Sequence, residues 1–162
     1  MSDIEKVLDG LGIGYRRYDH PAVYTVEQVE EVIPDLPGAK TKNLFLRDRK
    51  GRRHFLIVVA ARKRVDLKAC AQDLGAGKLS FASEERLRKH LGVDAGAVTL
   101  LALINDSERQ VEVFIDRAIW ESEEVQCHPL VNTATLVLSH QGLRDFLAGS
   151  GHDFQVLDVP SR

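Results

Sequence analysis

The sequence predicts an α/β fold, a single domain over residues 1–162 in which helices flank a mixed, mostly antiparallel central sheet. A chain of 162 residues is long enough for one core and short for two domains of ordinary size. Two runs rich in Leu, Phe, Ile and Val flank a glycine turn between residues 43 and 60, a pattern typical of a β-hairpin. Helical spacings alternate with further strand-like runs, which favours a mixed sheet.

The elements follow from local signals. Helices are expected at 3–11, 26–33, 67–74, 84–91 and 140–151; a capping residue precedes each of the first four, and Gly or Pro closes each of the five. The caps are Ser2, Thr25, Asp66 and Ser83, and "HQGLRDFLAGSG" is the last helix. Strands are expected at 15–20, 43–48, 54–60, 97–104, 110–119 and 133–139, with a short extended piece at 78–83 and an edge strand at 154–159.

The composition bounds the class of protein. Hydrophobic residues make up 44% and charged residues 28%, as in soluble globular domains. No apolar run reaches the roughly 18 residues of a membrane span, and the N-terminus lacks a signal-peptide pattern, so we expect a cytoplasmic protein without membrane contact. Two cysteines form no disulfide framework, and the six histidines show no metal-ligand spacing, so neither a metal nor a cofactor is expected.

Positive charge is concentrated between residues 47 and 64, although the net charge is only −2. Eight Lys and Arg side chains there face a single acidic residue, Asp48. A local basic stripe on a neutral protein suits a transient polyanionic partner. The alternative is a solvated hairpin with no partner.

Two familiar motifs fail on inspection. "GAGK" at 75–78 lacks the spacing of a phosphate-binding loop, and the dinucleotide pattern of three glycines is missing. Cys127 and His128 could form a nucleophile and base, but neighbours on a strand point to opposite faces. Polar residues instead gather at strand ends, where clefts form: Lys42 with Asn43, Asn105 with Asp106, and His128 ahead of Pro129.

Four segments, "KTKNLFLRD", "KLSFAS", "GVDAGAVTLLALIND" and "CHPLVNTATLVLS", in this order resemble the YbaK-like family, the editing domain related to the insertion domain of bacterial prolyl-tRNA synthetase. The resemblance covers nearly the whole chain, and the branch of free-standing alanyl-tRNA(Pro) deacylases is the most similar. It implies hydrolysis of an amino acid wrongly esterified to the terminal adenosine of tRNA(Pro). It also implies the acceptor stem of tRNA(Pro) as partner, with prolyl-tRNA synthetase or an elongation factor as further candidates.

The resemblance implies that Lys42 is the catalytic residue. It also implies that residues matching the pocket residues of the family line the pocket of this chain. The expected pocket residues are Tyr24, Asn43, Gly96, Ala97, Val98, Thr99, Asn105 and His128, and the expected tRNA-binding residues are Arg47, Arg52, Arg53, Arg62 and Lys63. Relatives often carry Gly-x-x-x-Pro where this chain has "GAVTL", so Leu100 departs from the pattern.

Three other functions remain open at this point. The substrate could be another small amino acid, such as Cys-tRNA(Pro). The chain could also be a noncatalytic module that binds tRNA or a synthetase, or a hydrolase that depends on Cys127. A monomer is expected, although an edge strand could pair in a dimer.

Overall fold

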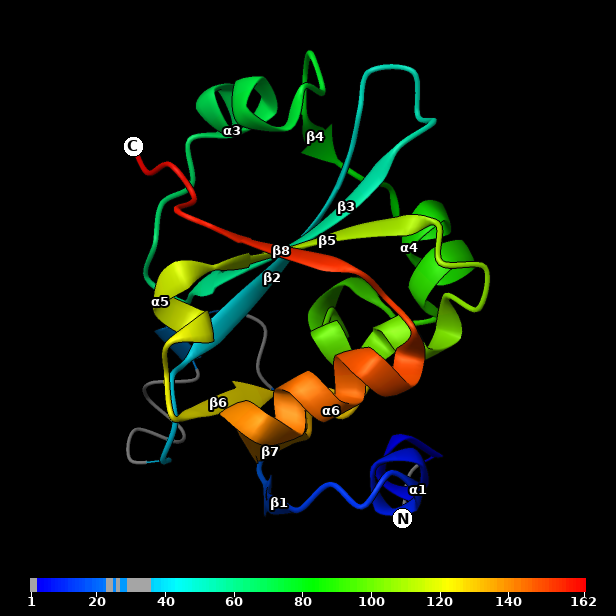
Figure 1. The fold of residues 1–162 in the computed structure, drawn as a ribbon, viewed down its shortest axis with the longest axis vertical. Coiled ribbons are helices and arrows are strands. Elements are labelled where there is room, and N and C mark those ends of the chain that lie inside the picture. Colours follow the sequence, from blue (N-terminus) through cyan, green and yellow to red (C-terminus); the bar gives the residue numbers. More distant parts are fainter. Residues whose placement is uncertain (1–2, 23–24, 26, 29–35) are drawn as a thin grey trace.

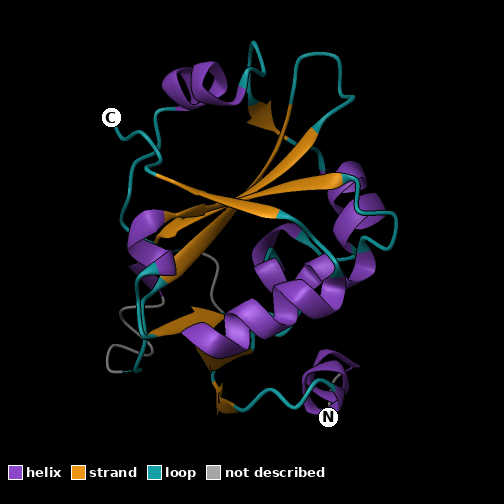
Figure 2. Ribbon diagram, viewed as in Figure 1, coloured by secondary structure: helices purple, strands orange, loops and turns teal. Residues whose placement is uncertain are grey.

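The computed structural model describes residues 3–22, 25, 27–28 and 36–162, and it contains two β-sheets with helices around them (Figures 1 and 2). The larger sheet has the strand order β4 (Ser80–Phe81), β2 (Thr41–Arg47), β3 (His54–Ala60), β5 (Val111–Asp116), β8 (Phe154–Leu157). The smaller sheet has the order β1 (Tyr15–Asp19), β7 (Ala134–Ser139), β6 (Glu124–Cys127).

Helices and short 3-10 turns connect these strands. The helices are α1 (Asp3–Gly10), α3 (Leu67–Leu74), α4 (Glu84–Leu91), α5 (Arg117–Trp120) and α6 (His140–Ser150), and the 3-10 helices are η1 (Ala95–Ala97) and η2 (Leu100–Asn105). None of the helices in the described part of the chain has both the length and the apolar character of a transmembrane span.

The expected α/β class with a mixed sheet is confirmed. β2 runs antiparallel to β3 and β4, whereas β3, β5 and β8 are parallel to one another. The smaller sheet is entirely antiparallel. Its separation from the larger sheet was not expected, because pairing partners far apart in sequence leave no local signal.

The strand predicted at residues 97–104 is wrong, since this segment forms η1 and η2. Leu100, Leu101 and Leu103 are all buried, so the segment is apolar on every side and its periodicity does not separate strand from helix. The Thr99 hydroxyl accepts a hydrogen bond from Leu101 N (3.3 Å) and begins η2. The helix predicted at 26–33 lies largely outside the described residues.

The helix caps behave as their residue types predict. Asp66 accepts from Ala69 N at 3.0 Å, and Ser83 accepts from Arg86 N at 3.2 Å. Gly92 ends α4 with φ of 64°, in the left-handed region.

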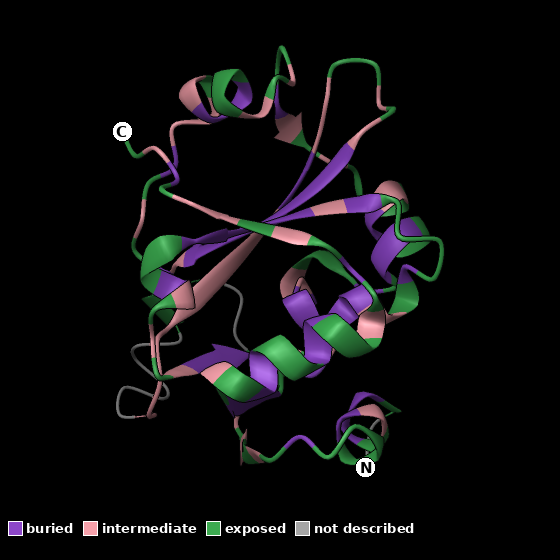
Figure 3. Cartoon of the chain, viewed as in Figure 1, coloured by how far each residue is buried: buried purple, intermediate pink, exposed green. Residues whose placement is uncertain are grey.

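The larger sheet separates two apolar clusters, and β3 is buried along almost its whole length (Figure 3). Leu56 and Val58 of β3 pack into the cluster that contains η2, α6 and the smaller sheet. Phe55 and Ile57 face the other cluster, which contains α3. Successive side chains of β2 therefore point to opposite faces as well.

Candidate active site

A cavity of about 180 Å³ opens beside the first half of β2, where the two sheets diverge. The main chain of Ala39 joins the smaller sheet, because its N–H donates to Glu124 O (2.9 Å) and its carbonyl accepts from Gln126 N (3.0 Å). Beyond this bridge residues of both β2 and β6 line the cavity. Its walls come from six stretches of the sequence: Thr25, Lys40, Thr41, Lys42, Asn43, Ala61, Ala95, Gly96, Val98, Gln126, Cys127, His128 and Thr135.

Among the residues that the structure describes, no strand pairs with the outer edge of the first half of β2. β4 pairs only with Leu46 and Arg47, at the far end of the strand. The Lys40 carbonyl accepts from Ala61 N on the side of β3 (2.9 Å), and the Phe45 carbonyl accepts from Ala82 N on the outer side (3.0 Å). Because backbone groups alternate between the two sides of a strand, the main chain of Asn43 faces outward with that of Phe45.

Asn43 contributes an unused acceptor. Its Oδ1 is buried and makes no hydrogen bond within the part of the chain that the structure describes. A buried carbonyl oxygen without a partner costs about 1–3 kcal/mol, so such groups are retained where a ligand satisfies them. Asn43 lines the cavity, and its oxygen is therefore suited to accept a hydrogen bond from a bound N–H or O–H donor.

Lys42 lies on the opposite face of β2 from Asn43, and the cavity at the strand edge is bordered by both. Burial, and then the nearby charges of Arg162 and Arg64, lower the pKa of Lys42. Arg162 is held beside Arg64 by a hydrogen bond from its N–H to the Arg64 carbonyl (2.8 Å). No ion pair joins Lys42 to any carboxylate among the residues that are described, so this group of cations is suited to a bound anion.

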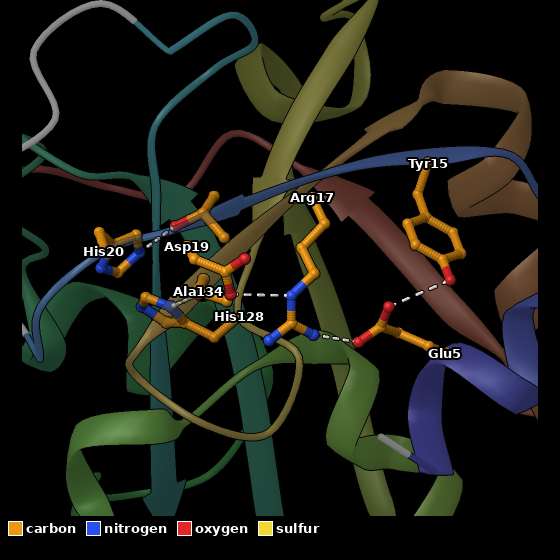
Figure 4. A network of polar contacts seen from close by, with 8 residues as sticks. Glu5, Tyr15, Arg17, Asp19, His20, His128 and Ala134 are labelled. Carbon is orange, nitrogen blue, oxygen red and sulfur yellow. Dashed lines mark hydrogen bonds and ion pairs between the residues drawn. The ribbon is translucent and has the colours of Figure 1, made fainter. Parts of the chain in front are cut away.

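His128 is held in a defined tautomer. Its Nδ1 lies 3.4 Å from the Ala134 carbonyl, which can only accept, so Nδ1 carries the hydrogen and Nε2 is free when the ring is neutral (Figure 4). Burial lowers the pKa of His128, the bond to Ala134 raises it, and the charge of His20 lowers it, with a net decrease. The ring is therefore neutral near pH 7, with one nitrogen available as a base or acceptor.

His20 fixes the hydroxyl of Thr135, another cavity residue. The Nδ1 of His20 lies 2.8 Å from the Pro21 carbonyl, and its Nε2 lies 2.9 Å from Thr135 Oγ1. When His20 is neutral, Nδ1 must donate to Pro21 and Nε2 must accept from Thr135. The Thr135 hydroxyl then offers only lone pairs to the cavity, and can accept but not donate.

An ion network anchors the strand that leads to His20. Arg17 lies between Glu5 of α1 and Asp19 of β1, with 3.0 Å from its Nε to Asp19 Oδ1, and Tyr15 donates to the same Glu5 at 3.2 Å (Figure 4). These contacts tie α1 to the smaller sheet immediately before His20.

The structure brings only some of the expected pocket residues together. Lys42, Asn43, Gly96, Val98 and His128 all line the cavity. Ala97 and Thr99 are buried beside it and are not among its lining residues, and Tyr24 lies outside the described residues.

Asn105 does not belong to the cavity. Its side-chain amide donates to the Leu91 carbonyl (2.8 Å) at the end of α4, next to Gly92. The strand end that the sequence suggested at this position does not exist, because residues 100–105 form η2.

The expected basic stripe divides into two groups at opposite ends of β2 and β3. Arg47, Arg52 and Arg53 lie at the hairpin turn, whereas Arg62 and Lys63 follow β3 at the end nearer the cavity. Arg47 lies five positions after Lys42, which corresponds to about 17 Å along an extended strand.

Several of these cations have internal partners. Arg53 donates to Glu112 at 2.8 and 2.9 Å and to the Gly75 carbonyl at 3.2 Å, and its guanidinium lies over the Phe55 ring. Lys63 is paired with the buried Asp116 at 2.9 Å. These contacts explain part of the positive charge as support for the fold.

Sequence reasoning missed Gln126 and Thr135, which β6 and β7 supply, as well as Thr41 and the two arginines beside Lys42, and it considered Cys127 only as the nucleophile of an alternative hydrolase. The side-chain Nε2 of Gln126 donates to the Pro37 carbonyl (3.1 Å). The main-chain carbonyl of Gln126 accepts from the Thr41 hydroxyl (2.7 Å). The available signal was a polar residue inside an apolar run. Among the residues described, no three His, Cys, Asp or Glu side chains are grouped so that they could hold a metal ion.

Comparison with known proteins identifies the family. The model of the aminoacyl-tRNA editing domain matches residues 20–146. The chain belongs to this family. The editing domain therefore confirms the resemblance seen in the sequence, and the chain is an aminoacyl-tRNA deacylase by family.

Similar proteins match this chain over nearly its whole length. The prolyl-tRNA editing protein ProX of Acetoanaerobium sticklandii is 40% identical over 152 residues, 94% of this chain and 93% of its own. The prolyl-tRNA synthetase associated domain-containing protein 1 of Bos taurus is 36% identical over 159 residues, 96% of this chain and 92% of its own. A solved structure described as a candidate trans-editing enzyme for prolyl-tRNA synthetase has a TM-score of 0.72 at 21% identity, with 100% and 99% of the two chains covered, and shows the same fold.

Proposed function

We propose that this chain acts in trans on mischarged tRNA(Pro), and that it hydrolyses the ester of alanine on the terminal adenosine. The names of the relatives support tRNA(Pro) as the RNA. The observation that carries the proposal is the meeting of Lys42, Asn43, Gly96 and His128 at one small cavity.

Such a reaction has a physical motive. A synthetase pocket shaped for proline cannot sterically refuse the smaller alanine, and one missing methylene changes binding by only about 1–3 kcal/mol. A second site that admits a methyl group and rejects a pyrrolidine ring completes the selection. A cavity of about 180 Å³ has the volume of roughly six liquid waters, a size suited to a small amino acid ester and its attacking water.

The cavity residues divide the recognition of the substrate. Lys42, with Arg64 and Arg162 nearby, binds a phosphate of the 3′ end. The α-ammonium group has three N–H donors and no acceptor, and it is matched by Asn43 Oδ1 and the Thr135 hydroxyl, both of which accept. Positioning of an already activated ester in this way supplies part of the rate acceleration.

Main-chain donors are available for the oxyanion. The Ala97 N–H donates to the Asp94 carbonyl (2.9 Å), which leaves the Gly96 N–H as the donor at the start of η1. The Asn43 N–H on the open strand edge is a second donor. His128 Nε2 accepts a hydrogen bond from the attacking water or from the ribose hydroxyl.

Replacement of Lys42 tests the proposal. Lys42→Ala should abolish deacylation of Ala-tRNA(Pro) and leave the melting temperature unchanged, whereas Lys68→Ala, which removes an exposed lysine of α3, should retain full activity. Full activity of Lys42→Ala would contradict the assigned role.

A substrate panel decides between the remaining alternatives. Hydrolysis of Ala-, Cys-, Ser- and Pro-tRNA(Pro) by the unmodified protein should be fastest for alanine and absent for proline. If Cys-tRNA(Pro) is hydrolysed faster than Ala-tRNA(Pro), cysteine and not alanine is the preferred amino acid. Binding of tRNA without turnover of any ester would make the chain a noncatalytic module.

A further inference from the structure

A second cavity, of about 520 Å³, lies between the hairpin turn and α4, at the other end of β2 and β3 from the candidate active site. Three cations line it, Arg52, Arg86 and Lys89, and Glu85 is the acidic residue among its lining. The cavity therefore has a net positive charge on a chain whose net charge is −2.

The floor of this cavity is a pair of neutral histidines. Arg86 Nη1 donates to the Gly51 carbonyl (3.0 Å) and lies 3.0 Å from His54 Nε2. Arginine stays protonated and has no acceptor, so His54 Nε2 must be unprotonated. The rings of His54 and His90 lie 4.1 Å apart, both side chains are buried, and burial lowers the pKa of each.

The charged groups that line the cavity have donors left for a bound anion. Nε and Nη2 of Arg86 make no hydrogen bond with the residues that the structure describes, and its Nη1 is fixed by the two acceptors. Arg52 and Lys89 are exposed, and within the same residues neither forms an ion pair. A fixed guanidinium with a free Nε–Nη2 edge, in a cavity that two further cations line, is suited to bind a phosphate through two parallel hydrogen bonds.

We propose that this cavity binds a phosphate group, supplied by the tRNA backbone at a distance from the aminoacyl end. The assignment to tRNA rests on the proposed function. α4 lines this cavity through Arg86 and Lys89, and the chain that leaves α4 reaches the candidate active site at Ala95 and Gly96. β2 links the same two places over about 17 Å, a span that several nucleotides of one strand can cover.

The phosphate site is tested without any hydrolysis. Inorganic phosphate titrated into the protein should shift the ring-proton NMR signals of His54 and His90 in a saturable manner. In the double variant Arg52→Gln/Lys89→Gln the phosphate affinity should fall at least tenfold. The matched control Lys68→Gln/Lys78→Gln, which removes two exposed lysines elsewhere, should leave it unchanged. Equal affinities in the two double variants, or no shift of either histidine in the unmodified protein, would overturn the site.

Uncharged tRNA(Pro) identifies the source of the phosphate. The dissociation constant measured at several salt concentrations should rise in Arg52→Gln/Lys89→Gln, and the slope of log K against log salt should shrink by about one to two, because each phosphate contact contributes about 0.7–0.9. An unchanged slope together with lost phosphate affinity would overturn the assignment to RNA and leave a site for free phosphate. Neither result depends on ester hydrolysis, so failure of the proposed function and failure of this site are distinguishable.

Discussion

Acid should destabilise the fold through His54, and the size of the effect follows from its surroundings. The ring is buried between Phe45 and His90 and accepts a hydrogen bond from Arg86, so protonation of the folded state loses that bond and places a charge beside another cation. Burial, then the charges of His90 and Arg86, lower the pKa of His54 from 6.5 to about 4, although Asp48 opposes this shift.

The sign of the effect is fixed by the lowered pKa. The unfolded chain takes up a proton near pH 6.5, whereas the folded chain does so only near pH 4. The stability from neutral His54 is therefore fully present above pH 6.5 and is lost as the pH falls toward 4. The difference corresponds to about 3 kcal/mol in total, of which about 2 kcal/mol is lost between pH 7.5 and 5.

Urea unfolding of the unmodified protein and of His54→Gln measures this loss. Glutamine keeps an acceptor for Arg86 but does not titrate. The free energy of unfolding should fall by about 2 kcal/mol more in the unmodified protein than in the variant between pH 7.5 and 5, with similar m values. Carboxylates titrate in both proteins and cancel in the comparison, whereas His90 is coupled to His54, so its own titration is followed by NMR in both proteins. Equal losses in the two proteins would refute the reasoning.

Three further predictions concern neighbouring parts of the molecule. Arg53→Ala should lower the free energy of unfolding by about 1–2 kcal/mol, because its bonds to Glu112 are lost, whereas Arg52→Ala should change it by less than about 0.5 kcal/mol; equal urea midpoints would contradict this. Cys127 should resist alkylation by iodoacetamide at pH 8, because burial raises its pKa to about 12. Mass spectrometry measures the labelling, and deacylation should survive the treatment. Inactivation that tracks labelling of this thiol would favour the Cys127-dependent hydrolase. Since burial lowers the pKa of His128, its neutral form persists as the pH falls, and the acidic limb of the kcat/KM profile for Ala-tRNA(Pro) should lie below pH 6.5; a limb centred above this value would exclude His128 as the titrating base.

Local signals predicted most of the fold. The hairpin of β2 and β3 was recognised from two apolar runs that flank a glycine turn, and α3 and α4 from the caps at Asp66 and Ser83. Residues 97–104 were misassigned because a segment buried on all sides lacks periodicity. The division into two sheets depends on pairings such as β1 with β7, more than 100 residues apart, which no local pattern encodes.

The candidate site was expected from polar residues at strand ends and from the family resemblance, which pointed to Lys42, Asn43 and His128. The error at Asn105 follows from the misassigned strand. Gln126 and Thr135 were missed because their importance depends on hydrogen bonds to Thr41 and His20, which the three-dimensional arrangement alone creates. The charge of Arg53 was visible in the sequence, but its partner Glu112 lies 59 positions away.

Ser83 lies between β4, which pairs with the outer edge of β2, and α4, which lines the second cavity. β4 ends two residues before it, and the Ala82 N–H makes the last contact with β2, at Phe45. Ser83 then caps α4 and turns the chain away from the sheet, so β4 does not pair with the outer edge of β2 at Asn43. The same turn places the cations of α4 against the hairpin. A longer β4 would pair with the edge at Asn43 and close the candidate active site, while a shifted cap would move Arg86 away from Gly51. One short strand and one capping serine thus lie between the strand edge that we propose for the ester and the positively charged cavity that we propose for the phosphate, on the two sides of a single turn.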